Sequence, residues 1–435
     1  MSVQMSLIKT VLALGLAVGC GVQLAFSEDG KERSPLNSSD FFPIMAWDWN
    51  YDNWNYFADE PSQRLEQLKM MKECGFTIAG LFRESELNLV QEAGLKALII
   101  DPRITYDWVG WLHGKKLEIN EDEARKKVES LVNEVKGRDV VYGYYVVDEP
   151  GSEVLPAVGI VTRLLKEADP SRITYVNLHP NYAPPKYIAG NYDEYLQSFI
   201  ELSQPNMLSV DNYFLMRPDE SIDSSLTALF YSNMAKMRDA SLAQNVPFWS
   251  VLLSMPHQTY VNITRGNMAR QVYASLAYGA KGLSYFCYFQ NRSPDATSGP
   301  IDRAGNKTPI WGIVSELNHE VLALAPTLNR LKVVRNYFLG EVPAGSEKPP
   351  GDALVTGFSG AASALLIGEF RHEDGGAFVF VVNTDRKQSA SVDLVFNNVS
   401  AVQRVSAKDG EMQEVVDGRL LLKAGEGALL KLTLK

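Results

Sequence analysis

Short apolar runs alternate with amphipathic stretches over most of this chain, and this alternation limits the possible folds more than any other feature. Eight such runs, each four to eight residues long, lie between residues 42 and 289. Runs of this length indicate buried strands, and the stretches between them have helical spacing. Continuous apolar strands that alternate with helices indicate a parallel sheet covered by helices. The expected strands are Phe42–Trp47, Thr77–Phe82, Ala97–Ile100, Val141–Val147, Thr174–Leu178, Met207–Val210, Phe248–Leu253 and Gly282–Phe289.

Eight strand–helix units predict an α/β fold of the closed (β/α)8 type, the TIM barrel. The rival architecture, a doubly wound open sheet, needs a glycine-rich phosphate loop after an early strand. The sequence has none, since Gly110 and Gly137 are isolated. The expected helices include Pro61–Glu73, Glu121–Lys136 with Asn120 as N-cap, Ser152–Ala168, Thr264–Tyr278 and Thr308–Leu331.

The pattern changes after residue 335, where a segment rich in proline and glycine is followed by short alternating runs. We predict a barrel over residues 28–335, a linker over 336–352 and a small antiparallel β-sandwich over 353–435. The sandwich lacks a strip of aromatic residues, so we interpret it as an accessory domain. Its expected strands are Ala364–Glu369, Ala377–Asn383, Ala390–Phe396, Val402–Ser406, Leu420–Leu422 and Ala428–Leu434.

Residues 1–27 have the pattern of a secretory signal peptide, with Lys9 before an apolar run that is too short to span a bilayer stably. Two endings are open. Cleavage after small residues near Ser27 would release the protein, whereas the lipobox-like stretch before Cys20 would leave it lipid-anchored through that cysteine. We therefore expect an exported protein, which is periplasmic, an outer-membrane lipoprotein or extracellular. Cys74 and Cys287 remain, and we expect both to be buried free thiols.

Charge and composition exclude several classes of function. The chain has 42 Lys and Arg against 52 Asp and Glu, a net charge of −10, which argues against a nucleic acid bound through a basic surface. Three cysteines rule out a disulfide scaffold. No His/Cys cluster has zinc spacing, and we expect no metal, no organic cofactor and no membrane span.

The fourth expected strand ends in the most informative motif of the chain. In a (β/α)8 barrel the functional site lies at the C-terminal ends of the strands. The run Val141–Val147 stops at two carboxyl residues and a proline, Asp148, Glu149 and Pro150. Pro150 cannot continue a central strand and helps to fix the turn. The competing interpretation is that one of the carboxyls only caps the next helix, a role for which Ser152 is better placed.

This motif, on an eight-unit barrel with a trailing β-sandwich, resembles the clan A glycoside hydrolases and their less-characterised bacterial relatives over about residues 40–435. The resemblance implies that Glu149 is the general acid/base and that Asp148 contacts the sugar near its 2-position. A glycosidic oxygen is a poor leaving group, and a carboxylic acid with a raised pKa can protonate it as the bond breaks. Asp148 beside Glu149 would favour the protonated form of one of the pair.

The resemblance fails at the seventh strand, where clan A enzymes carry a glutamate nucleophile. The stretch Trp249–His257 contains no carboxylate. Three alternatives stay open. Asp211, after the sixth run, acts as nucleophile or as the base of an inverting reaction. Asp148 and Glu149 work with the substrate's own acetamido group, as in acetamido-hexosaminidases. In the third alternative the barrel has lost catalysis and only binds sugar. For Asp211, an ion pair at the barrel mouth is the competing interpretation.

Aromatic residues support a carbohydrate partner, because a flat ring packs against the C–H face of a sugar. Those on the expected upper loops are Trp47, Trp49, Tyr51, Trp54, Tyr56, Trp108 and Trp111. With polar residues from the strand ends, they give a candidate substrate-binding set of Trp47, Asp48, Trp49, Asp101, Asn177, His179, Tyr213, His257, Tyr288 and Gln290. For any single ring or histidine, packing or a structural hydrogen bond is the competing interpretation.

The sequence thus predicts a glycoside hydrolase that acts on a poly- or oligosaccharide, with Glu149 as proton donor and Asp211 or Asp148 as second carboxylate. One rival hypothesis is a non-catalytic carbohydrate-binding or surface protein on the same barrel. Another is a lyase that cleaves uronate polysaccharide with Tyr213 or His257 as its base. A lyase leaves the carboxyl motif after the fourth strand unexplained.

Overall fold

The computed structural model describes residues 41–48, 60–106, 116–217, 224–291, 294–415 and 419–435. The expected signal peptide and its lipobox-like stretch lie outside these residues. Within them, no helix is both long and apolar enough to cross a membrane. Among the same residues, no three His, Cys, Asp or Glu side chains are grouped as metal ligands.

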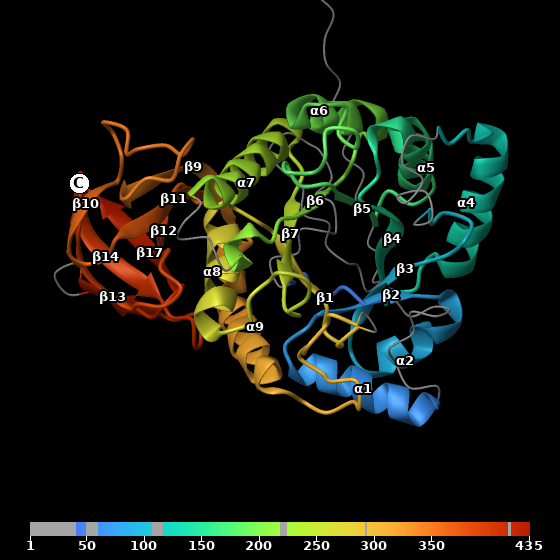
Figure 1. Ribbon diagram of the computed structural model, residues 1–435, viewed down its shortest axis with the longest axis horizontal. Helices are drawn as coiled ribbons and strands as arrows, with labels where there is room; N and C mark the ends of the chain where they lie inside the picture. The colour runs from blue at the N-terminus through green and yellow to red at the C-terminus, as the bar shows by residue number, and fades with distance from the viewer. Residues whose placement is uncertain (1–40, 49–59, 107–115, 218–223, 292–293, 416–418) are drawn as a thin grey trace, which may run out of the picture.

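Eight parallel strands close into a barrel in sequence order, and β1 pairs with β8 to complete the ring (Figure 1). Each strand overlaps one of the predicted apolar runs, so the predicted (β/α)8 barrel is confirmed. The strands are β1 (Ile44–Ala46), β2 (Ile78–Phe82), β3 (Lys96–Ile99), β4 (Val141–Asp148), β5 (Ile173–Leu178), β6 (Leu208–Asp211), β7 (Phe248–Leu253) and β8 (Gly282–Phe286).

Helices follow the strands and cover the outside of the barrel (Figure 1). They are α1 (Pro61–Glu73), α2 (Leu87–Glu92), α4 (Glu121–Val135), α5 (Leu155–Ala168), α6 (Tyr192–Ser203), α7 (Ser224–Gln244), α8 (Arg265–Ala277) and α9 (Pro309–Leu328), with short 3₁₀ turns η3 (Glu84–Glu86), η4 (Ser152–Val154) and η5 (Phe214–Met216). Asn120 caps α4 as predicted, because its side chain accepts from the Glu123 N–H at 3.0 Å.

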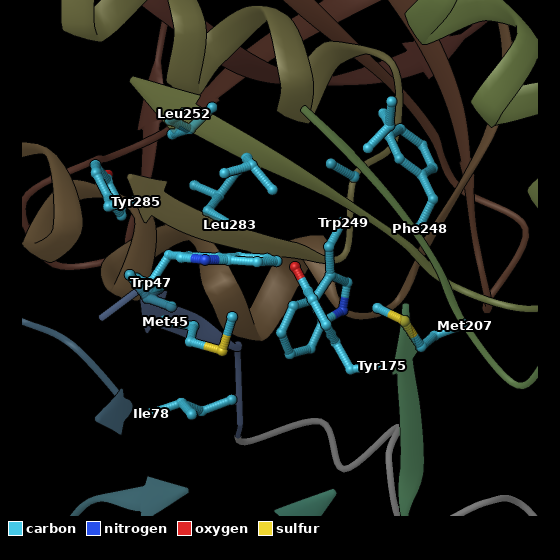
Figure 2. Close-up of a cluster of buried hydrophobic side chains, with 14 of the residues drawn as sticks. Met45, Trp47, Ile78, Tyr175, Met207, Phe248, Trp249, Leu252, Leu283 and Tyr285 are labelled. Carbon is cyan, nitrogen blue, oxygen red and sulfur yellow. The ribbon is translucent and has the colours of Figure 1, made fainter. Parts of the chain in front are cut away.

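Large aromatic side chains fill the inside of the barrel (Figure 2). The Tyr175 ring lies 5.5 Å from that of Trp47 and 5.6 Å from that of Trp249, centroid to centroid. Gly282, the first residue of β8, makes room for this packing, since a Cβ there would lie 2.5 Å from atoms of the Trp249 ring. The barrel is therefore a packed core, and a ligand has access only at its mouth.

The C-terminal strands form two antiparallel sheets, one with three strands in the order β10-β13-β16 and one with six in the order β15-β14-β17-β12-β11-β9. Apolar residues of both sheets share one core, which confirms the predicted small β domain. The strands are β9 (Leu331–Gly340), β10 (Val355–Ala361), β11 (Ala364–His372), β12 (Ala377–Asn383), β13 (Ala390–Phe396), β14 (Val399–Val405), β15 (Met412–Glu414), β16 (Arg419–Leu422) and β17 (Gly427–Leu434).

Strand β9 differs from the sequence-based boundaries. It begins at Leu331, directly after α9, and pairs with β11 along its length. The predicted junction between barrel and linker at residues 335 and 336 therefore falls inside this strand. Arg335 lies within this strand, and its guanidinium is paired with the buried carboxylate of Glu369 at 2.7 Å. The sheet thus begins before the stretch rich in proline and glycine.

Helix α8 lies between the barrel and the C-terminal sheets (Figure 1). Every residue from Gly266 to Ala277 is buried. Arg270 donates to the carbonyl of Leu215 in η5 at 2.5 Å and to that of Thr384, after β12, at 3.2 Å. This helix therefore connects the turn after β6 to the β domain.

Candidate active site

Three neighbouring strand ends bring a carboxyl, an amide and a second carboxyl together. Asp148 ends β4, Asn177 lies near the end of β5, and Asp211 ends β6. The Asn177 side-chain nitrogen donates to an Asp148 oxygen at 3.0 Å and to an Asp211 oxygen at 3.4 Å. The Asn177 oxygen accepts from the Ser209 hydroxyl at 3.0 Å, which fixes the amide with its N–H groups toward the carboxyls.

Asp211 lies in an environment that favours its protonated form. Burial raises the pKa of Asp211 well above its ordinary value, and the negative charge of Glu149 adds to this rise. Hydrogen bonds from Tyr213 and Asn177 oppose part of the effect, because they stabilise the ionised carboxylate. The influence of Glu149 shows that the carboxyls after β4 and β6 interact electrostatically.

Glu149 lies in a left-handed backbone conformation, with φ at 44°. Such a conformation is strained for a non-glycine residue and is often found at functional sites. Its N–H donates to the Asn177 carbonyl at 2.8 Å, and one carboxyl oxygen lies 3.4 Å from Nδ1 of His179. The Glu149 side chain is 40% exposed, against 6% for His179. The carboxyl is therefore anchored on one side and open to solvent.

Ser152 does not cap a helix, which corrects the sequence-based prediction. The turn η4 begins at Ser152 after Gly151, and no side chain caps it. The Ser152 hydroxyl instead donates to the Tyr187 carbonyl at 3.0 Å. The serine thus connects the turn after β4 to the segment after β5.

Aromatic residues form a wall beside Asp211. Tyr213 packs against Tyr260 and Phe286, with ring centroids 5.8 and 6.3 Å apart. His257, partly exposed, lies 5.7 Å from the Phe286 ring. The Tyr182 hydroxyl donates to the Tyr260 hydroxyl. Burial raises the pKa of Tyr182, and the negative charge of Asp211 raises it further. The wall offers ring faces and hydroxyl groups to a ligand.

The sequence analysis missed three of these residues, Tyr182, Tyr260 and Phe286. Strand β8 ends at Phe286, where a cis peptide bond to Cys287 follows, whereas the apolar run continues to Phe289. The predicted strand extends three residues beyond the observed one, so the sequence places the strand end at Phe289 and not at Phe286. Tyr182 and Tyr260 lie in loops, where the sequence gives no periodic signal.

Three members of the predicted substrate-binding set lie in the interior. Trp47 is 2% exposed, and Asp48 and Tyr288 are both 0% exposed. Asp48 accepts from the N–H groups of Tyr288 at 3.1 Å and Phe289 at 3.2 Å, and burial raises its pKa to about 8 despite these bonds. All three are packed in the core, and their contact with substrate stays a prediction.

The remaining members are distributed around the mouth. The Asp101 carboxylate accepts hydrogen bonds at 2.8 Å from the Arg103 guanidinium. Burial alone would raise the pKa of Asp101, but these bonds and the positive charge of Arg103 lower it. Gln290 donates to the Ala296 carbonyl at 2.8 Å. Trp49 lies outside the described residues, as do five other predicted aromatic residues, Tyr51, Trp54, Tyr56, Trp108 and Trp111. Both thiols, Cys74 and Cys287, are buried and free as predicted.

The end of β7 holds no carboxyl group where the resemblance would place a nucleophile. Strand β7 ends at Leu253, and the next residue, Ser254, is buried and donates to the Cys287 carbonyl at 2.9 Å. Asp211 at the end of the adjacent strand β6 is thus the carboxyl that lies near Glu149 and interacts with its charge.

No protein-family model matches the chain, and no curated protein matches its sequence. Solved structures do match its fold. A β-galactosidase from Bacillus circulans sp. alkalophilus has a TM-score of 0.61 at 9% identity, over 92% of this chain and 100% of that one. The chain has the fold of clan A-like glycoside hydrolases. A family 5 glycoside hydrolase from Bacteroides vulgatus ATCC 8482 gives a TM-score of 0.57 at 12% identity, over 93% of this chain and 90% of that one.

A further glycoside hydrolase matches with a TM-score of 0.56 at 12% identity, over 94% of both chains. Because these matches cover more than nine-tenths of the chain, they include the clan A-like barrel and the C-terminal sheets. The likeness establishes the fold of the chain and does not establish its chemistry.

Proposed function

We propose that this protein is a glycoside hydrolase that cleaves glycosidic bonds in a poly- or oligosaccharide, with Glu149 and Asp211 as its acid–base pair. One arrangement carries the proposal: the carboxyls at and just after the end of β4 and the carboxyl of Asp211 that ends β6 lie at neighbouring strand ends, with Asn177 bonded to both Asp148 and Asp211. Burial and the charge of Glu149 raise the pKa of Asp211. Two interacting carboxyls at the barrel mouth are the groups that glycoside hydrolysis needs, one protonated and one ionised. The clan A-like fold supports a glycoside hydrolase with Glu149 as its acid, whereas the choice of Asp211 depends on its place at the end of β6.

We expect a proton to move from Asp211 to Glu149 when substrate binds. In the free protein it lies on Asp211, since burial raises the pKa of that carboxyl. Glu149 is 40% exposed, and a sugar that covers it removes water from its carboxylate. In this proposal Glu149 receives the proton that Asp211 gives up before the glycosidic bond breaks. Glu149 then donates to the glycosidic oxygen, and the ionised Asp211 activates water or attacks the sugar.

Asn177 and Tyr213 fit this sequence of events because both donate hydrogen bonds to Asp211. Such bonds stabilise the carboxylate at the moment when its proton leaves. Asp148 shares the amide of Asn177, so it orients this group and stays available to a sugar hydroxyl. In this proposal Asp148 positions the substrate and does not transfer a proton.

The first test compares the mature protein with its Glu149→Gln and Asp211→Asn variants on a panel of plant, algal and host glycans that includes β-galactosides. New reducing ends and ultraviolet absorbance are followed together. We expect reducing ends from the wild type and a loss of about 10²–10⁴-fold in each variant, the usual contribution of a general acid or base. Glu153→Gln, an equivalent change in the same turn, is the control and should keep full activity.

Two results would contradict the proposal. Ultraviolet absorbance would reveal a double bond formed by a lyase. Glycan binding without turnover, equally strong in both variants, would identify a carbohydrate-binding protein on an enzyme-like barrel.

A further inference from the structure

The segment that follows β5, residues 179–195, is bonded to the turn that follows β4. The Tyr195 hydroxyl donates to the Pro150 carbonyl at 2.8 Å. Ser152 donates to the Tyr187 carbonyl twice, from its N–H at 2.8 Å and from its hydroxyl at 3.0 Å. These bonds hold the backbone immediately after the proposed acid, where the left-handed conformation needs support from its surroundings.

The same two tyrosines enclose the ring of His179. Tyr187 is stacked on the imidazole, with centroids 5.5 Å apart and planes 11° apart. The Tyr195 ring covers the imidazole from another direction, with the two centroids 6.2 Å apart. Its hydroxyl accepts from the backbone N–H of His179 at 3.4 Å. The side chain is only 6% exposed. The imidazole therefore has little freedom to rotate.

The two ring nitrogens of His179 have different surroundings. Nδ1 lies 3.4 Å from a carboxyl oxygen of Glu149, whereas Nε2 is buried with no hydrogen-bond partner among the described residues. A proton on Nε2 would be a buried donor without an acceptor, which is unfavourable. The tautomer with its proton on Nδ1 avoids this and directs that proton toward the Glu149 oxygen 3.4 Å away.

We infer that His179 is a positioning residue for Glu149, held by Tyr187 and Tyr195 so that Nδ1–H binds one oxygen of the carboxyl group. As a catalytic statement this inference rests on the proposed function. The oxygen that accepts from His179 is a poor site for the acidic proton, so the proton occupies the other oxygen. His179 thereby selects the oxygen that faces the leaving group, and it acts on Glu149 without touching the substrate itself.

Two substitutions separate this role from packing. His179→Asn keeps an N–H donor near the place of Nδ1, and His179→Phe keeps a flat ring for Tyr187 but has no donor. We expect His179→Phe to lower kcat about tenfold or more, with KM within about twofold, and His179→Asn to restore kcat to within about threefold of the wild type. An aryl glycoside whose leaving group needs no protonation should be cleaved by all three proteins at similar rates.

Equal losses in both variants, or a rise in KM alone, would overturn the inference, since they indicate packing or direct contact with substrate. A second readout does not need activity. The chain has five histidines, and ¹⁵N-histidine spectra can be assigned with the His179→Asn variant. We expect the Nδ1–H tautomer for His179 in the wild type and its loss in Glu149→Ala. An Nε2–H tautomer in the wild type would refute the inference even if the proposed function failed on every glycan.

Discussion

Two buried carboxyl groups, Asp48 and Asp211, show how the surroundings of a single residue change its acidity. Both have lost water, and burial is the largest cause of the rise in pKa at each. Asp48 has backbone N–H donors that favour its ionised form, and its pKa still rises to about 8. Asp211 has the added charge of Glu149, which couples it to a group that substrate can reach. In the proposed function, the second arrangement is the one that transfers a proton.

Asp48 should make stability depend on pH. In the folded state it keeps its proton up to a pKa of about 8, whereas in the unfolded chain it releases the proton near pH 4. Between these values the folded state binds more protons, so each unit of rising pH lowers the free energy of unfolding by up to about 1.4 kcal/mol. Asp48→Asn removes this dependence. Urea unfolding of both proteins at about pH 5, 6.5 and 8 should show a difference in free energy that changes steadily with pH; a constant difference would contradict the prediction.

At the scale of elements, the strands could be predicted where burial on both faces makes a run continuously apolar. This holds for all eight barrel strands, and it placed Asp148, Glu149 and Asp211 at strand ends. The rule fails where an apolar run leaves the sheet, as after Phe286, because a buried loop has the same composition as a strand. It also cannot reveal Asn177 as the bridge between two carboxyls, since that contact depends on the register of three strands.

The start of β8 offers a test of barrel packing. A Cβ at Gly282 would lie 2.5 Å from atoms of the Trp249 ring, so Gly282→Ala should lower the free energy of unfolding by about 1–3 kcal/mol. Gly312→Ala is the control, because it lies in α9 with nothing within 4 Å of its Cβ and should raise stability by about 0.5–1 kcal/mol. Urea unfolding measures both. If both variants changed the free energy of unfolding equally, the Trp249 ring would have to move aside at no cost, which would contradict the prediction.

At the scale of the whole molecule, the barrel and the C-terminal sheets share α8 as a common buried layer. Gly368 in β11 faces the carbonyl of Ala277 at the end of α8, where a Cβ would lie 2.2 Å from the oxygen. In the middle of the helix, Arg270 donates to a carbonyl on the barrel side and to one on the side of the C-terminal sheets. Contacts this close leave no room for the two parts to move independently.

The two parts should therefore unfold together. All seven tryptophans of the chain lie at or before Trp311, so their fluorescence reports on the barrel and not on the C-terminal sheets. We expect Gly368→Ala to shift the midpoint of the fluorescence transition to lower urea by the equivalent of about 1–3 kcal/mol, together with that of circular dichroism. Gly357→Ala in β10, which has nothing within 4 Å of its Cβ, should leave both unchanged. A fluorescence midpoint that stays in place would show that the barrel is stable alone.

The bonds of Arg270 also bear on how such proteins can be recombined. A single guanidinium reaches η5, the turn that follows β6, and the segment after β12. Exchange of the β domain at the proline-rich stretch would break this link, because Arg270 belongs to the barrel side of that cut. A chimaera whose replacement sheet offers no carbonyl to Arg270 would therefore leave this guanidinium without one of its partners beside the turn after β6.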